Sequence, residues 1–237
     1  MSVDARPAYV LHTYPYRETS LIVEAYVSDH GRLPLMARGA RRPKSSVRGV
    51  LLPFQPLLVS WTGKRELRTL TRAEWRGGYA PLRGQPLICG FYLNELLLKL
   101  LPRDDPHEEL FRMYESTLEA LAAGGEPPAL LRRFEIALLR ELGYALVLDR
   151  DVERGEPVAR ERSYVYVVER GPVSSDVSAA PNGVELSGQT LIDMQSGSFT
   201  SAATQQESKA LMRALINHYL GNQVLHTRQL LRDLQEL

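Results

Sequence analysis

The hydrophobic pattern of this chain changes at the pair Gly77-Gly78, and that change constrains the fold more than any other feature. Before the pair, short apolar runs alternate with polar side chains, which is typical of β-strands. After it, apolar side chains recur at three- and four-residue spacing, which is typical of α-helices. The glycines and the prolines that follow them interrupt both patterns. We therefore predict an α+β protein, with a β-rich domain at residues 1–80 and a mainly helical domain at residues 81–237.

The β-rich domain is expected to contain about five short antiparallel strands. Aromatic and β-branched residues dominate these runs, and turn residues separate them. Pro34 lies inside the third run, so we expect that strand at an edge or at a bulge. Five short strands favour a small barrel or sandwich, and the OB-fold is the commonest nucleic-acid-binding barrel of this size. The expected strands are 9–14, 20–28, 31–38, 52–61 and 66–75.

The helical domain is expected to include a small irregular insertion of strands and loops at residues 149–200. Its first helix is apolar on most sides, which is typical of a helix in the middle of a bundle. Thr204 and Glu207 have the spacing of a capping box, so we expect a helix to begin there. The expected helices are 86–101, 104–123, 127–142, 204–221 and 223–237.

The formal net charge of +1 hides an unequal distribution of charge along the chain. Residues 1–80 contain 13 lysines and arginines and 6 acidic residues, whereas the remainder contains 16 and 22. A basic module followed by an acidic one indicates that a polyanionic partner would bind the first domain.

The strongest concentration of positive charge follows the third expected strand. Arg38, Arg41, Arg42 and Lys44 fall within seven residues, and no acidic residue occurs between positions 31 and 63. Glycine and proline in this stretch favour a loop. Because arginine and lysine neutralise phosphates, we interpret it as a nucleic-acid-binding loop, with a plain solvated loop as the alternative. The cations expected to widen this track are Arg48, Lys64, Arg65, Arg68 and Arg72.

Aromatic residues accompany these cations in the first domain. Bases of single strands stack on exposed rings, but most rings in so small a barrel must lie in its core. Tyr14 and Tyr16, in a turn flanked by proline, are the rings that we expect to be exposed.

The helix expected at residues 127–142 carries a second cationic feature. Arg132, Ile136 and Arg140 follow one another at four-residue spacing, with Arg133 beside them. An apolar strip edged by arginines could receive a short acidic-hydrophobic peptide. The alternative is an amphipathic helix with solvated arginines, and the spacing alone favours that alternative.

Signs of catalysis or metal binding are absent from the sequence. It contains no P-loop, no dinucleotide-binding glycine motif and no zinc-protease motif, and its five histidines are scattered. Cys89 is the only cysteine, which excludes an internal disulfide and a cysteine-based zinc site. We find no nucleophile with a base, so we expect a protein that is not an enzyme, with no catalytic residue, cofactor or metal. No signal peptide or bilayer-spanning run is visible, which favours a cytoplasmic protein that does not engage a membrane.

A series of fragments along nearly the whole chain resembles the bacterial RecO family of recombination mediators. Each fragment is weak evidence, but their order and spacing together are specific. They are YVLH at 9–12, ETSL at 18–21, Gly31, ARGARR at 37–42, LPF at 52–54, YLNEL at 92–96, LRRFE at 131–135, ELGY at 141–144, YLG at 219–221 and RQLL at 228–231.

The resemblance implies an N-terminal OB-fold, a helical C-terminal domain and a place near the nucleoid of a bacterial cell. It implies binding to single- and double-stranded DNA and annealing of complementary strands coated by single-stranded DNA-binding protein. It also implies partnership with RecR and help in loading RecA. The acidic tail of the coating protein would dock on the helical domain. This favours Arg132, Arg133, Ile136 and Arg140 as the residues that receive the tail, with Arg132 as the first candidate. Many members carry a four-cysteine zinc site after the ELGY motif; residues 149–157 contain no cysteine, so we predict no zinc.

Two other functions remain open from the residues themselves. An OB-fold protein that binds RNA would prefer RNA to DNA oligomers of the same sequence. A pure protein adaptor, whose basic face meets an acidic partner, would bind no oligonucleotide even at low salt.

Overall fold

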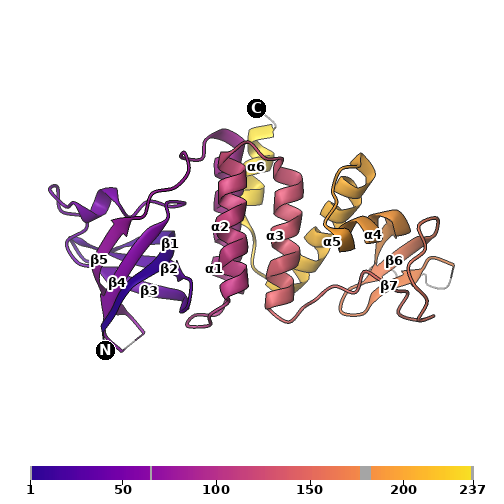
Figure 1. The fold of residues 1–237 in the computed structure, drawn as a ribbon, viewed down its shortest axis with the longest axis horizontal. Helices are drawn as coiled ribbons and strands as arrows, with labels where there is room; N and C mark the ends of the chain where they lie inside the picture. The colour runs from indigo at the N-terminus through magenta and orange to yellow at the C-terminus, as the bar shows by residue number, and fades with distance from the viewer. Residues whose placement is uncertain (1, 65, 177–182, 236–237) are drawn as a thin grey trace. The chain divides into compact units, whose positions relative to one another are not determined.

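The computed structural model describes residues 2–64, 66–176 and 183–235, and it confirms the α+β class (Figure 1). An N-terminal β-sheet region precedes a helical region. The chain forms two compact units, Met1–Gly125 with Leu225–Leu237 and Glu126–Val224. The first unit therefore extends beyond the boundary expected at residue 80, because two helices and the C-terminal helix group with the strands.

Five strands close into a barrel in the order β1-β2-β3-β5-β4. All neighbours are antiparallel except β3 and β5, which are parallel and meet at Leu35↔Arg68 and Met36↔Thr69. The first half of β1 pairs with β4 and the second half with β2, so this one long strand closes the sheet. The strands are β1 (Ser2–Tyr16), β2 (Ser20–Val27), β3 (Gly31–Ala37), β4 (Leu57–Thr62) and β5 (Arg68–Trp75).

Pro34 lies inside the barrel sheet without breaking it. It pairs with Glu24 of β2 and precedes the two β3–β5 pairs, so it lies on the part of β3 that has no strand on its other side. The expectation of an edge-like position is thus met locally.

The barrel core contains side chains from four strands and from the loop after β3: Ala8, Val10, Val23, Ala25, Val27, Leu33, Leu35, Ala37, Ala40, Leu51, Leu57, Val59 and Trp61.

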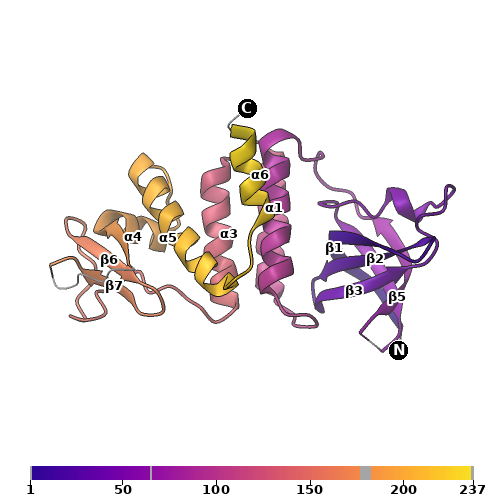
Figure 2. The same cartoon turned by 180° about the vertical axis from the view of Figure 1, so that it is seen from behind.

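The helices of the first unit are α1 (Gly84–Leu100), α2 (Glu108–Ala122) and α6 (His226–Gln235), and α6 lies beside α1 in Figure 2. Tyr9 and Tyr26, on the outer face of the barrel, pack their rings against Phe111 and Tyr114 of α2. The outer face of β1 and β2 is therefore apolar where the helices cover it.

The segment between α1 and α2 is bound to the barrel, which corrects the expected start of α2 at residue 104. The Asp104 amide donates to the Arg32 carbonyl at 2.9 Å, and Arg103 pairs with the buried Glu24. A Cβ on Gly31 would lie 2.1 Å from the Asp105 carbonyl oxygen, so only glycine permits this approach. These tertiary contacts hold the segment in a non-helical conformation, in which Asp104 has a φ of 57°, and α2 begins at Glu108.

The second unit combines helices with a small sheet of order β7-β6-β8. This sheet and α4 lie within the region expected to be an irregular insertion. The elements are α3 (Pro127–Glu141), β6 (Ser163–Val167), β7 (Gly171–Ser174), β8 (Val184–Ser187), α4 (Gly188–Ser196) and α5 (Ala202–Leu220).

The capping box expected at Thr204 and Glu207 is wrong. The N-cap of α5 is Ser201, whose hydroxyl accepts from the Thr204 amide. Glu207 instead accepts hydrogen bonds from the amide and hydroxyl of Ser187, the N-cap of α4. Glu207 therefore binds the N-cap of the preceding helix and not that of its own.

None of the described helices is long and apolar enough to cross a bilayer.

Candidate nucleic-acid interface

The basic loop, which we define as residues 38–49, leaves the barrel where β3 ends at Ala37. Gly39 has a φ of +68°, and its carbonyl accepts from the Arg42 amide at 3.0 Å, which forms a tight turn. Ala40 is buried in the barrel core, so it anchors the loop while its charged neighbours point outward. The loop ends in the short 3-10 helix η1 (Val47–Gly49).

The five cations of the basic loop are exposed, and within the described chain none of them pairs with a carboxylate. Their charges remain available to an external anion, because no carboxylate among the described residues neutralises them. They are Arg38, Arg41, Arg42, Lys44 and Arg48.

Hydrogen bonds tie the basic loop to the turn between β1 and β2. The Arg41 amide donates to the Thr19 carbonyl at 2.8 Å, and its guanidinium donates to the Arg17 carbonyl at 3.1 Å. The Arg17 guanidinium lies 5.3 Å from the centre of the Tyr16 ring, within cation–π range. The structure thus adds Arg17, which sequence reasoning missed: it is an isolated arginine, and only the fold brings it beside the loop.

The other expected cations do not all join this cluster. Lys64 is exposed in the turn after β4, beside Thr62, which pairs with Ser2 at the opposite end of β1 from the basic loop. Arg68 is largely buried and pairs with Asp104 at 2.6 Å. Arg72 is exposed and pairs with Glu74 at 2.7 Å. Arg65 lies outside the described residues.

The four α3 residues considered for a partner tail differ in exposure. Arg132 is buried and pairs at 2.5 Å with Glu135, which is fully buried. Arg133 is exposed and donates to the Gly197 carbonyl at 3.0 Å, whereas the exposed Arg140 lies 3.9 Å from Glu141. Ile136 is partly buried against the core of the second unit. The spacing from Arg132 to Glu135 is readable in the sequence as a helical ion pair.

No group of three or more histidine, cysteine or acidic side chains within the described ranges could hold a metal ion. Cys89 is buried in α1, and this burial raises the pKa of its thiol, which keeps the thiol protonated.

The fold and the basic loop together define a class of protein: a small closed β-barrel followed by a helical region. The barrel presents exposed cations that have no acidic partner in the described part of the chain, as in proteins that bind polyanions. Family models support a narrower assignment. Residues 1–79 match the model described as "Recombination protein O N terminal", and residues 83–230 match "Recombination protein O C terminal". The chain belongs to the recombination protein O family.

Curated relatives agree over nearly their full length. A protein of Nitrosospira multiformis is 54% identical over 234 residues, covering 99% of this chain and 97% of its own. A protein of an Azoarcus species is 54% identical over 237 residues, covering 99% and 98%, and one of Aromatoleum aromaticum is 53% identical with the same coverage. Each of these relatives is named "DNA repair protein RecO".

Proposed function

We propose that this protein is a non-catalytic DNA-binding mediator of recombinational repair, which anneals complementary single strands and assists the loading of RecA. The observation that carries the proposal is the basic loop, whose five exposed cations have no carboxylate partner within the described residues. The strand order, with β3 and β5 in parallel, supports an OB-fold for the barrel. The name of the relatives supports a role in DNA repair.

Annealing requires no covalent chemistry. Two DNA strands repel each other through their phosphates, and cations between them release counterions and reduce that repulsion. Arg38, Arg41, Arg42 and Lys44 would contact phosphates, and Arg48 lies on the same loop. Lys64 would contact a phosphate only if the DNA reached the other end of β1, and Arg68 and Arg72 would first have to leave Asp104 and Glu74.

The double variant Arg41→Glu/Arg42→Glu tests the basic loop. We expect it to weaken binding to single- and double-stranded DNA and to slow annealing of complementary oligonucleotides. The dependence of log K on log salt should become shallower by about one unit for each arginine that no longer neutralises a phosphate, because each neutralised phosphate releases condensed counterions. Fluorescence anisotropy over a salt series measures both the affinity and this slope.

The matched control is Arg160→Glu/Arg213→Glu, which changes the net charge equally in the second unit. Both arginines are exposed and make no ion pair within the described residues. We expect the control to retain the salt slope of the unaltered protein. An unchanged slope in the Arg41→Glu/Arg42→Glu variant would show that the loop does not contact phosphates.

We further propose that RecR is a partner and that α3 receives the acidic tail of single-stranded DNA-binding protein. Arg133 and Arg140 are the exposed cations of the expected receiver, with Ile136 between them. Arg132 would contribute only if the tail entered the pair with Glu135. Removal of Arg132 alone is a poor test, because it leaves a buried carboxylate without its cation and destabilises the protein.

The better variants are Arg133→Glu and Arg140→Glu. We expect each to weaken binding of a fluorescent tail peptide roughly five- to tenfold through like-charge repulsion, without changing DNA affinity. Arg213→Glu on α5 is the control. Equal peptide affinity in all three variants would exclude α3 as the receiver.

A further inference from the structure

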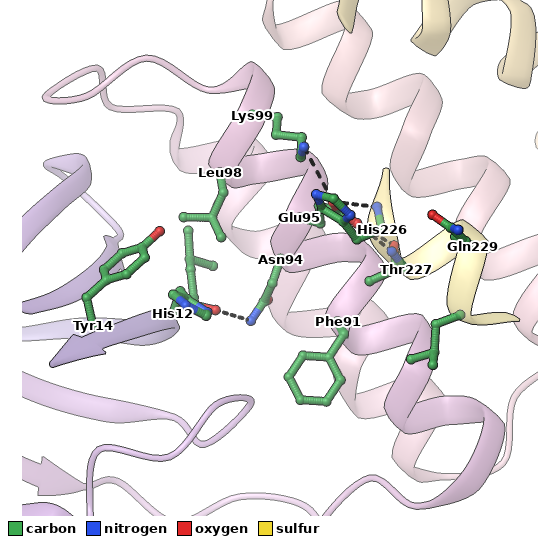
Figure 3. A pocket seen from close by; sticks show the side chains of 12 residues that line it. His12, Tyr14, Phe91, Asn94, Glu95, Leu98, Lys99, His226, Thr227 and Gln229 are labelled. Atoms are coloured by element: carbon green, nitrogen blue, oxygen red, sulfur yellow. Dashed lines mark hydrogen bonds and ion pairs between the residues drawn. The ribbon is translucent and has the colours of Figure 1, made fainter. Parts of the chain in front are cut away.

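A groove of about 720 Å³ lies between β1, α1 and α6 within the first unit (Figure 3). His12 and Tyr14 of β1 line one side, Phe91 and Leu98 of α1 line another, and Leu230 of α6 completes it. Tyr14 is 45% exposed and Phe91 is 41% exposed. Two aromatic rings from different elements thus face solvent around one groove.

A β-bulge in β1 produces the aromatic side of the groove. The register between β1 and β2 shifts between Val10 and His12, and Thr13 then pairs with Val23 of the barrel core. Because paired residues share a face and side chains alternate along a strand, His12, Tyr14 and Tyr16 all lie on the outer face. The His12 and Tyr14 rings meet edge to face at 4.5 Å.

Hydrogen bonds fix the positions of β1, α1 and α6 around the groove. Asn94 of α1 donates to the carbonyl of Leu11 at 2.9 Å, at the bulge, where the β1–β2 ladder is interrupted. The Glu95 carboxylate accepts from the His226 and Thr227 amides at 2.8 and 2.9 Å and lies 3.5 Å from Lys99. The negative charge of Glu95 is therefore balanced inside the protein and does not repel an anion that enters the groove.

The outer face of β1 connects the groove to the basic loop. From Tyr14 it continues to Tyr16, then to Arg17 over the Tyr16 ring, and then to Arg41, which donates to the Arg17 carbonyl. The rings lie on one face of a strand, and the cations that follow them have no acidic partner among the described residues. They match the two requirements of single-strand binding, which are surfaces for base stacking and charges for phosphates.

We propose that single-stranded DNA runs along the outer face of β1 from the basic loop into this groove, with bases stacked on Tyr16, Tyr14 and Phe91. The inference rests on the proposed DNA-binding function and gives it a path. A peptide would also fit an apolar groove, but the continuity of rings with the basic loop favours a nucleic acid. Duplex DNA, whose base faces are already stacked, would contact the loop and not the groove.

The variant Tyr14→Ala tests the path. We expect it to bind an oligothymidylate about tenfold more weakly, because each stacked base contributes measurably to single-strand affinity. Its affinity for duplex DNA and its salt slope should not change, since no charge is removed. Tyr14→Phe keeps the ring and should restore single-strand affinity. A merely structural role for Tyr14 would instead lower single-strand and duplex affinity together.

Tyr144→Ala is the matched control, because Tyr144 is 44% exposed and lies in the second unit. Since Phe91 packs against Phe54 and its removal would disturb the fold, the second measurement is photocrosslinking of an iodouracil-substituted oligonucleotide to the unaltered protein. Crosslinks to Tyr14, Tyr16 or Phe91 are expected, and crosslinks only to residues outside this path would overturn the proposal.

Two failures are distinguishable. If the unaltered protein binds no oligonucleotide at low salt, the proposed function itself fails, and this path with it. If it binds with a steep salt slope but Tyr14→Ala matches it on single strands, only the path fails. If Tyr14→Ala lost affinity for an acidic-hydrophobic peptide but kept its affinity for single strands, the groove would be a peptide site. That result would likewise overturn the path.

Discussion

The carboxylate of Asp151 holds together a segment of the second unit that has little regular structure. It accepts hydrogen bonds from the amides of Glu153, Arg154 and Ser174 at 2.9, 3.1 and 3.0 Å. Burial alone would raise the pKa of this carboxyl, but the hydrogen bonds outweigh burial and lower the pKa to about 2. One charged side chain thereby joins a turn to strand β7.

Asp151→Ala is expected to lower the free energy of unfolding by roughly 2 kcal/mol at pH 7. Because the pKa of Asp151 is lower in the folded protein than its ordinary 3.8, its stabilising effect is complete above about pH 4 and is lost as the pH falls toward 2. Urea denaturation at pH 7 and pH 3 should show the difference between variant and unaltered protein shrinking with acid. Asp149→Ala is the control, since its exposed carboxylate makes only a 3.7 Å contact with Arg150. A constant difference across this range would contradict the assignment.

The pair of Arg132 and Glu135 shows how one buried charge alters the interpretation of a helix face. Four-residue spacing placed Arg132 beside Ile136 and Arg140 as if all three were equivalent. In the structure Arg132 is buried with Glu135, and Arg140 is exposed. Burial is a property of the tertiary environment, so helical periodicity could identify the neighbours but not which of them water reaches.

Helix α6 depends on a cap supplied by another helix. Its first amides, those of His226 and Thr227, donate to the Glu95 carboxylate of α1, and so does the Thr227 hydroxyl. Burial of Glu95 raises the pKa of its carboxyl, but hydrogen bonds from Thr227 and His226 prevail and lower it. An acid at a helix N-terminus also interacts favourably with the helix dipole.

Glu95→Ala should therefore loosen α6 without unfolding the barrel. We expect a loss of about 1–2 kcal/mol in local stability, comparable to the removal of an N-cap. Hydrogen exchange should become faster at the His226 and Thr227 amides and remain unchanged in β1 to β5. Glu119→Ala, an exposed residue of α2 without an ion pair among the described residues, is the control. Unchanged exchange at those two amides would show that the cap does not hold α6.

At the level of the whole molecule, the barrel and its covering helices behave as one unit. Tyr9, Leu11 and Tyr26 lie on the outer face of the barrel and are 1%, 2% and 0% exposed when the helices are in place. The Tyr26 hydroxyl donates to the His107 carbonyl, and Arg32 donates to the Leu101 carbonyl. A barrel cut from the helices would expose these groups to water.

A fragment of residues 1–80 is thus expected to be much less stable than the whole chain. Exposure of three large apolar side chains costs about 1.5–3 kcal/mol each. The fragment should bind a hydrophobic dye and unfold without cooperativity. The whole chain should not bind the dye and should unfold cooperatively. Near-ultraviolet circular dichroism and thermal unfolding measure the difference. A cooperative transition near that of the whole chain would show that the barrel is an independent domain.

Much of the fold is predictable because local interactions determine it. Alternating apolar residues place β2 and β3 within one residue of their observed ends, and glycines and prolines mark most turns. The start of α2 was wrong because Arg32 and Glu24, remote in sequence, hold the preceding segment. The basic loop was readable from composition alone, but Arg17 was not, because its proximity to Arg41 depends on the pairing of β1 with β2.

The sequence by itself determined the succession of strands and helices and the concentration of cations after β3, since these follow from neighbouring residues along the chain. Only the tertiary structure decided that β1 closes the barrel through β4 and that α1, α2 and α6 join it. It also decided that Arg68 and Arg132 pair with acids, whereas the cations of the basic loop pair with none among the residues that the structure describes. The physical reason is that closure, burial and ion pairing depend on groups far apart in sequence, whose proximity no local pattern encodes.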